Sequence, residues 1–489
     1  MSDKQNTISN ATKWSTITEI AAKLISPISN MILARLLTPD AFGVVTTATM
    51  IFSFADMFTD AGFQKYLVQH EFGNAEEKEK STTVAFWTNM AMSIFFWLFI
   101  CIFNEQLAVA VGNPGLGIVF VVSCISLPLT SFSSIQMALY RRDFDYKTLF
   151  YVRLVSVIIP LVVTVPLAFL TRSFWAIIIG TICGNLSNAV ILTWKSTWKP
   201  RLFYDFAVLH EMLSFSIWSL IEAITIWLTN YIGIFLVGRY LSSYYLGLYK
   251  TSMNTVNQIM NLIISSTTTV LFAALSRSQN KKSEFEKIFF TFQRNVGLLV
   301  LPMGVGIFLY RKLVTQILLG SQWMEATDFI GLWALVNAVK IVLSNYCSEA
   351  YRAMGKPKVS VFVQTSQLVS LVPLLLYGAQ RGFETLYIMR CLVSLELIVI
   401  NLITIKVTLQ ISGLKMIQNV LPEIVAAIGM VPVSLFLSNI GHGMVWEIVT
   451  IFICGLVYFL FIYLLPWSRG WFSILVIDIT KKIRKKVTR

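Results

Sequence analysis

The sequence predicts an all-α integral membrane protein of about 14 transmembrane helices, built as two pseudo-symmetric six-helix lobes plus two C-terminal helices. Three observations support this fold class. Of the 489 residues, 56% are hydrophobic and only 13% are charged, and the mean hydropathy is +0.70, which leaves too little polar surface for a water-soluble globule. Apolar runs of about 20 residues, long enough to cross a hydrocarbon core as a helix, recur along the chain. A weak internal repeat relates the two halves.

The repeat has a spacing of 204 positions. An ungapped shift places Arg35 on Arg239 and Gly43 on Gly247, within nine identities over thirty positions. Each copy holds six predicted crossings, an even number, so both copies enter the membrane in the same direction and are related by an axis along the membrane normal. We therefore expect the two polar corners, residues 34–43 and 238–247, to lie on the same outer face.

The predicted spans are apolar runs bounded by polar or charged connections. The first lobe, residues 1–205, holds six of them: Ala11–Leu37, Gly43–Leu67, Thr82–Phe103, Gly115–Leu139, Leu149–Leu170 and Phe174–Lys195. The second lobe, residues 206–410, holds six more: Leu209–Val237, Thr251–Ala274, Ile288–Tyr310, Ala326–Glu349, Val359–Gly378 and Glu384–Val407. Residues 411–466 add Val420–Ile440 and Met444–Leu465, and residues 467–489 form a basic amphipathic tail.

Lys and Arg residues gather on one set of alternate connections. Counted from the N-terminus, that set holds 28 cations and the other set holds seven. Short cytoplasmic loops accumulate cations, so both termini are predicted to be cytoplasmic. The polybasic tail either lies on anionic lipid or serves only as a topology anchor. Because the cations are spread over many loops and form no single patch, no nucleic-acid partner is expected.

Several function classes are disfavoured by what the connections and reactive residues lack. The six cysteines lie in apolar stretches and the three histidines are scattered, so neither a disulfide frame, a metal site nor a cofactor is expected. The first fifteen residues lack the features of a cleaved signal peptide, so we expect the N-terminus to be retained. No connection is long enough for a soluble catalytic domain and no nucleotide-binding P-loop is present, which favours a transporter over an enzyme.

Polar side chains inside the predicted spans are the candidate functional residues, because an ionisable group in a bilayer usually faces a cavity. Four cations remain outside the loop count: Lys23, Arg153, Lys340 and Arg390. Further polar residues share helix faces in spans one, two, seven and eight: Glu19 and Asn30; Asp56 and Asp60; Glu222; Asn257, Gln258 and Asn261. These four spans are expected to line a common polar cavity.

Each candidate also has a structural interpretation. Glu19 and Lys23 are four residues apart and could neutralise each other within one helix. Asp60 lies near a helix end, where water could solvate it. The amides of span eight could join helices to one another. Arg390 could pair with Glu396 and do nothing more.

Taken together, the pattern resembles the polysaccharide exporters of the multidrug/oligosaccharidyl-lipid/polysaccharide (MOP) superfamily. The phrases that carry the resemblance are LARLLTPDAFGVVTTATMIFSFADMFTDAGF (residues 33–63), MALYRRDFDYKTL (137–149) and EAYRAMGKPKVS (349–360). The resemblance covers nearly the whole chain. It implies a flippase that carries undecaprenyl-diphosphate-linked oligosaccharide units across a bacterial inner membrane by alternating access, for capsule, exopolysaccharide or O-antigen synthesis.

The resemblance also assigns expected roles. Deep cations would hold the diphosphate, and amides would hold sugar hydroxyls; the candidate substrate-binding residues are Lys23, Asn30, Arg153, Asn257, Gln258, Asn261, Lys340 and Arg390. The candidate ion-coupling residues are Glu19, Asp56, Asp60 and Glu222. Expected partners are the lipid-linked oligosaccharide, membrane lipids, and a polysaccharide polymerase with its chain-length machinery. The alternatives are a cation-coupled multidrug exporter of the same superfamily and, from another class, a membrane-embedded polymerase or glycosyltransferase.

Overall fold

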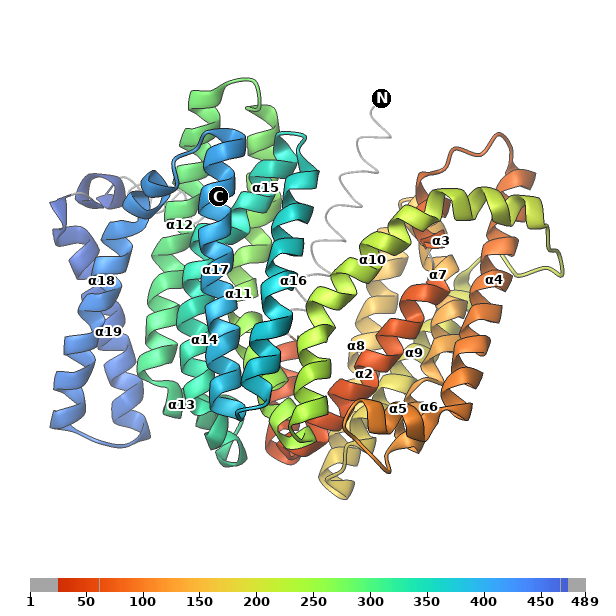
Figure 1. Cartoon of the computed structure of the whole chain (residues 1–489), viewed down its shortest axis with the longest axis horizontal. Helices are drawn as coiled ribbons and strands as arrows, with labels where there is room; N and C mark the ends of the chain where they lie inside the picture. Colours follow the sequence, from red (N-terminus) through yellow and green to blue (C-terminus); the bar gives the residue numbers. More distant parts are fainter. Residues whose placement is uncertain (1–24, 61, 467, 474–489) are drawn as a thin grey trace, which may run out of the picture. The chain divides into compact units, whose positions relative to one another are not determined.

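A computed structural model describes residues 25–60, 62–466 and 468–473, except for a few side chains that include that of Glu222. Within these ranges the regular structure is helical, and no strand occurs (Figure 1). The chain forms two compact units, Met1–Thr251 and Ser252–Arg489, which we call unit 1 and unit 2. Their boundary lies inside α11 (Ser243–Arg277), whereas the repeat places a boundary between residues 205 and 206. The lobes deduced from the repeat stay a prediction.

Unit 1 contains a helix for each predicted span of the first half. Residues 25–36 are helical, and the rest of the first span lies outside the described residues. The following helices are α2 (Pro39–Asp60), α3 (Phe63–Gln69), α4 (Ala75–Ile102), α5 (Asn104–Ala110), α6 (Gly117–Ser123), α7 (Ser126–Arg142), α8 (Tyr146–Thr171), α9 (Trp175–Lys195) and α10 (Phe206–Tyr240).

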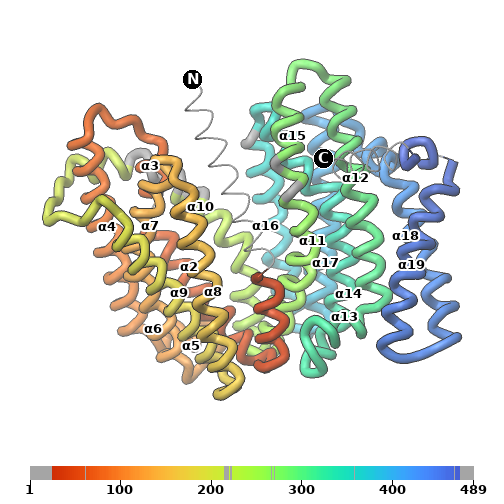
Figure 2. The backbone as a smooth tube through the Cα atoms, turned by 180° about the vertical axis from the view of Figure 1, so that it is seen from behind, coloured from red at the N-terminus to blue at the C-terminus, as the bar shows by residue number. Residues whose placement is uncertain are grey.

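Unit 2 follows the predicted spans from the eighth to the last in the same way, whereas the seventh, which corresponds to α10, lies in unit 1. Its helices after α11 are α12 (Lys282–Leu309), α13 (Arg311–Leu318), η1 (Ser321–Ala326), α14 (Thr327–Lys340), η2 (Ile341–Asn345), α15 (Tyr346–Ala353), α16 (Pro357–Ala379), α17 (Phe383–Leu409), α18 (Gly413–Ile440) and α19 (Met444–Leu464). Figure 2 shows α12, α18 and α19 as neighbours within this unit, in agreement with their packing contacts.

In the described part of the chain, eleven helices are long and apolar enough to cross a membrane, or twelve if the two parts of α11 form one span. The membrane class and the all-α fold are therefore confirmed, while the count of 14 is not.

Besides the bent α11, three predicted spans are not single regular helices. The second is divided at Gly62, whose φ of 82° lies in the left-handed region that a glycine adopts without steric cost. The fourth is interrupted between α6 and α7. The tenth contains the π-helical segment η2 between α14 and α15. Apolar run length predicts a crossing but is insensitive to such local breaks, because each run stays hydrophobic through the break.

The two repeat-related corners meet inside unit 1. A Cβ atom on Gly43 would lie 1.8 Å from the Ser243 carbonyl oxygen, and one on Gly247 would lie 1.8 Å from the Pro39 carbonyl oxygen. The Ser243 hydroxyl also donates a hydrogen bond to the Asp40 carboxylate. Each glycine thus lets the start of one helix approach the start of its repeat counterpart, so this contact needs both glycines.

The core of unit 2 extends into the last two helices. Buried side chains of α12, α18 and α19 form one cluster, in which the Tyr458 hydroxyl donates a hydrogen bond to the Leu298 carbonyl at 3.0 Å. An ion pair joins Arg294 to the fully buried Glu423 at 2.9 Å. The two additional helices are therefore packed into unit 2.

Candidate functional site

The polar face of α2 packs against hydroxyl groups of α7 in unit 1. Thr130 Oγ1 donates to Asp56 Oδ1 at 2.9 Å, and Ser134 Oγ donates to Asp60 Oδ1 at 3.4 Å. Asp56 and Asp60 are four residues apart on α2, and Thr130 and Ser134 are four residues apart on α7. One helical turn of each helix therefore supplies both contacts. Asp60 is half-buried and hydrogen-bonded, which argues against an aspartate that is merely solvated at a helix end.

The contact between α2 and α7 continues as a network into neighbouring helices. The Ser134 hydroxyl accepts hydrogen bonds from the side-chain amides of Gln64 at 3.1 Å and Asn89 at 3.3 Å. Arg141 in turn donates to Gln64 Oε1 at 3.0 Å. No ion pair to Asp56 or Asp60 occurs within 4 Å among the residues that the structure describes, and hydroxyl groups of α7 donate hydrogen bonds to both carboxylates.

Unit 2 brings two of the predicted cations to one aromatic ring. Lys340 Nζ lies 5.0 Å and Arg390 Cζ lies 5.1 Å from the ring centroid of the buried Trp333. We call Lys340 and Arg390 the cation pair. Each cation lies at a distance typical of a cation–π contact, and the two charges are at most about 10 Å apart because both lie about 5 Å from one point.

The cation pair has no counter-charge in the described part of the chain. Neither side chain has a carboxylate within 4 Å there, and one terminal nitrogen of Arg390 is buried without a hydrogen-bond partner. Glu396 instead accepts a hydrogen bond from the Ser370 hydroxyl at 2.5 Å, so the structure contains no Arg390–Glu396 ion pair. Two cations on neighbouring spans without a nearby carboxylate make this place a candidate site for an anion.

An amide layer fixes the indole of Trp333. Asn257 Oδ1 accepts hydrogen bonds from Trp333 Nε1 at 3.3 Å and from Asn337 Nδ2 at 3.0 Å. This part of the α11 amide stripe joins helices, as the structural interpretation suggested. Gln258 is half-buried and Asn261 is exposed, and neither has a hydrogen bond to the cluster within the described ranges.

The π-helical segment η2 begins directly after Lys340. Its backbone carbonyl at Val342 accepts a hydrogen bond from Gln293 at 3.3 Å, and its Ser344 hydroxyl accepts one from Asn401 at 2.7 Å. π-helical turns are uncommon and often occur at functional sites. In this span, side chains from α12 and α17 satisfy polar groups of the irregular segment next to the cation pair.

The remaining sequence candidates are not part of either cluster. Arg153 is exposed on α8, and Asn30 is half-buried in the helix of residues 25–36. Glu19 and Lys23 lie outside the described residues, as does the side chain of Glu222. Of the candidates for substrate binding, unit 2 therefore unites Asn257, Lys340 and Arg390, with Asn257 acting through the indole.

Sequence reasoning missed the side chains that organise these clusters. Trp333 precedes Lys340 by seven residues, two helical turns, and this spacing was a usable signal for a shared helix face. Thr130 and Ser134 share the four-residue spacing of Asp56 and Asp60, which was equally visible. The described residues contain no group of three or more potential metal ligands arranged to hold an ion.

Comparison with known proteins identifies the family. The profile of a family described as "Polysaccharide biosynthesis protein" matches residues 32–328, more than half of the chain. An uncharacterized membrane protein in the cps region of Klebsiella pneumoniae is 22% identical over 397 residues, covering 78% of this chain and 80% of that protein. The succinoglycan biosynthesis transport protein ExoT of Rhizobium meliloti (strain 1021) is 23% identical over 378 residues, covering 77% and 75%.

Solved structures share the fold. The lipid II flippase MurJ in an inward closed conformation aligns with a TM-score of 0.75 at 14% identity, covering 94% of this chain and 99% of MurJ. An inward-facing multidrug resistance MATE family transporter of the MOP superfamily aligns with a TM-score of 0.60 at 10% identity, covering 78% and 92%. These findings confirm the resemblance drawn from the sequence: the chain is a multi-pass membrane protein with the fold of MOP-superfamily transporters, and it belongs to the polysaccharide biosynthesis protein family.

Proposed function

We propose that this protein is a flippase that moves lipid-linked oligosaccharide repeat units across the bacterial inner membrane for surface polysaccharide synthesis. The carrier lipid is undecaprenyl diphosphate, and transport proceeds by alternating access without an enzymatic step. One observation carries the proposal: the half-buried cation pair of unit 2 lies at the buried Trp333 with no carboxylate within 4 Å in the described part of the chain.

Electrostatics supports an anionic substrate group at this place. A charged side chain at the centre of a bilayer costs roughly 2.5 to 3.5 kcal/mol on insertion scales, and two cations at most about 10 Å apart also repel each other. A function that accounts for this cost is the binding of an anionic ligand, whose negative charge the two cations would stabilise. A diphosphate carries at least two negative charges and accepts hydrogen bonds from ammonium and guanidinium groups, so it matches the pair in charge and in hydrogen bonding.

The same charges disfavour the alternative of a cation-coupled drug exporter. A cationic drug near Lys340 and Arg390 would meet like charge in a poorly solvated region, where repulsion is weakly screened. The carboxylates that could attract such a drug, Asp56 and Asp60, lie in unit 1 and already accept hydrogen bonds from α7. We assign Asp56 and Asp60 to ion coupling, a role that a hydrogen-bonded carboxylate performs by exchanging its proton or cation during transport.

The topology and partners follow from the same proposal. From the cation bias we infer that both termini are cytoplasmic, as is the connection that contains Lys80. The lipid-linked unit would therefore be loaded from the leaflet on this side of the membrane. The exported unit would then be consumed outside by a polymerase with its chain-length machinery. Reporter fusions after Lys80 and after Arg489 should both give cytoplasmic signals, and a periplasmic signal at either position contradicts the topology.

A deletion strain tests the function directly. We expect it to lack the surface polysaccharide, to accumulate lipid-linked oligosaccharide in the inner leaflet, and to recover both properties when the wild-type gene is returned. Complementation with Lys340→Met or Arg390→Met should fail at normal protein levels. A deletion strain with unchanged polymer and no accumulated lipid intermediate would refute the proposal.

A further inference from the structure

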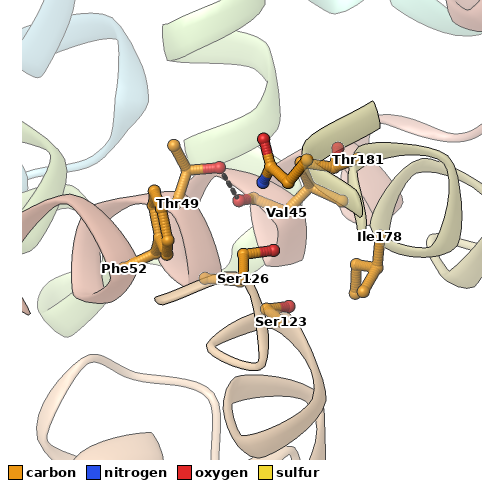
Figure 3. A pocket seen from close by; sticks show the side chains of 9 residues that line it. Val45, Thr49, Phe52, Ser123, Ser126, Ile178 and Thr181 are labelled. Atoms are coloured by element: carbon orange, nitrogen blue, oxygen red, sulfur yellow. Dashed lines mark hydrogen bonds between the residues drawn. The ribbon is translucent and has the colours of Figure 1, made fainter. Parts of the chain in front are cut away.

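An uncharged cavity in unit 1 is separate from the residues assigned so far to the phosphates. Its volume is about 210 Å³, far above the ~30 Å³ that one water molecule occupies in the liquid. It lies among α2, α6, α7 and α9, and its polar and aromatic lining comprises Thr49, Phe52, Ser123, Ser126, Thr181 and Asn185. Figure 3 shows Thr49 and Phe52 on one side of this space and Ile178 and Thr181 on another, with the two serines between them.

Two hydroxyl groups of this cavity have no hydrogen-bond partner among the residues that the structure describes. Ser126 is 2% exposed, and the Oγ atoms of both Ser123 and Ser126 are buried without a hydrogen bond. The Thr49 and Thr181 hydroxyls, in contrast, donate to the carbonyls one turn earlier in their own helices, Val45 and Ile177. Leaving a buried hydroxyl unsatisfied is unfavourable, so Ser123 and Ser126 are set up for a ligand that fills the cavity.

The chemistry of the lining indicates the class of ligand. None of the residues around the cavity is charged, which excludes a site selected for a phosphate or a metal ion. Hydroxyls and the half-buried amide of Asn185 can each donate to and accept from a sugar hydroxyl. The ring of Phe52 offers an apolar wall to the C–H face of a pyranose. Few polar groups within a mostly apolar wall are typical of a small-molecule site.

The cavity also lies toward one end of its helices. Thr49 is ten residues into α2 and Thr181 is six residues into α9, so both lie within about 15 Å of the helix starts. With cytoplasmic termini, these starts belong to the outer face. Thr49 and Thr181 are exposed while Ser126 is buried, so the cavity opens beside the two threonines.

We propose that this cavity binds one neutral sugar residue of the transported oligosaccharide in the outer half of unit 1. The inference rests on the proposed flippase function and deepens it. It assigns hydrogen bonding to the sugar to Ser123, Ser126 and Asn185, and ring stacking to Phe52. None of these roles involves the phosphates, which the proposed function assigns to the cation pair.

The test compares two lipids that differ only in their sugars. One probe is undecaprenyl diphosphate, and the other is the lipid-linked oligosaccharide extracted from the deletion strain. Binding of each to the purified full-length protein in detergent is measured for wild type, Ser126→Ala and Asn185→Leu. The matched control is Ser133→Ala, on the same helix as Ser126, because Ser133 is buried but does not line the cavity.

We expect wild type to bind the glycolipid more tightly than the bare lipid diphosphate. Ser126→Ala should weaken binding of the glycolipid by about 2- to 12-fold, the range for one lost hydrogen bond, and leave binding of the bare lipid diphosphate unchanged. Ser133→Ala should change neither affinity. Because the Ser126 hydroxyl has no hydrogen-bond partner in the described ranges, its removal should not lower the melting temperature.

The possible failures are distinguishable. If wild type prefers the glycolipid and both cavity variants keep that preference, the cavity holds water only and this inference is wrong while the proposed function stands. If the cavity variants weaken both lipids equally, their effect is on the fold and the inference is likewise wrong. If wild type binds neither lipid, both proposals are overturned.

Discussion

Removing one charge of the cation pair should weaken diphosphate binding without destabilising the protein. The variants Lys340→Met and Arg390→Met keep an unbranched apolar stem against Trp333 and delete only the charged head. A cation about 4 Å from one negative charge contributes up to about 4 kcal/mol at an effective dielectric constant near 20, and a charge-assisted hydrogen bond contributes about 1.5 to 3 kcal/mol. A loss of about 2 to 4 kcal/mol corresponds to roughly 30- to 1000-fold weaker binding.

Neither substitution should lower the stability of the protein. Two like charges at most about 10 Å apart repel by at least about 1.7 kcal/mol at the same dielectric constant, and this repulsion disappears in either variant. The lost cation–π contact costs about 0.5 to 2 kcal/mol, which offsets the gain. We therefore expect a melting temperature equal to that of wild type or higher. Removing one member of an ordinary buried ion pair would instead be strongly destabilising.

The assay measures both quantities on the same purified protein. Affinity for undecaprenyl diphosphate and the thermal unfolding midpoint are determined for both variants and for a control, Arg381→Met. Arg381 is also a cation over an aromatic ring, with its Cζ 3.8 Å from the Tyr377 centroid, but it is exposed and outside the cluster. The reasoning is refuted if both variants bind the lipid as tightly as Arg381→Met does. A lowered melting temperature with unchanged affinity would show that the pair is structural.

Three further predictions concern unit 1. Asp56→Asn retains an oxygen acceptor for its hydroxyl donor on α7, so protein level should stay near wild type while surface polysaccharide is lost; normal polymer would remove Asp56 from ion coupling. Gly43→Ala places a Cβ 1.8 Å from the Ser243 carbonyl oxygen and should lower the free energy of unfolding, measured with denaturant, by about 1 to 3 kcal/mol. The control Gly455→Ala, whose Cβ meets no atom within 4 Å, should not lower this free energy. If the contact between residues 34–43 and 238–247 opens during alternating access, cysteines replacing Asp40 and Ser243, which hydrogen-bond to each other, should crosslink and arrest export in a protein without its native cysteines. Undiminished export at full crosslinking would show that this contact stays closed throughout transport.

The location of the spans was predictable because hydrophobicity is a local property of the chain. Each of the predicted spans from the second to the last coincides with a helix or a broken helix, from α2 to α19. The break at Gly62 and the π-helical segment after Lys340 were not predictable, because neither interrupts the apolar run. They depend on which neighbouring side chains satisfy the backbone there, such as Gln293 from α12.

The sequence likewise predicted only part of the candidate site. Lys340 and Arg390 were identified as unusual because a charge inside an apolar run is evident from composition alone. Their proximity was not evident, since the two residues lie 50 positions apart on α14 and α17 and meet only through Trp333. The expected alternative, a pairing of Arg390 with Glu396, is wrong because Glu396 is hydrogen-bonded to Ser370 on α16.

The sequence by itself determined that this is a helical membrane protein, where its apolar segments begin and end, and which charges lie inside them. These properties follow from the free energy of transferring short segments into hydrocarbon, which needs no knowledge of neighbours. Only the tertiary structure decided which side chains meet, namely Asp56 with Thr130, Lys340 and Arg390 with Trp333, and Ser123 and Ser126 with Thr49 and Thr181 around one cavity. Such contacts depend on how helices rotate and pack against one another, and packing between helices is a property of the whole fold.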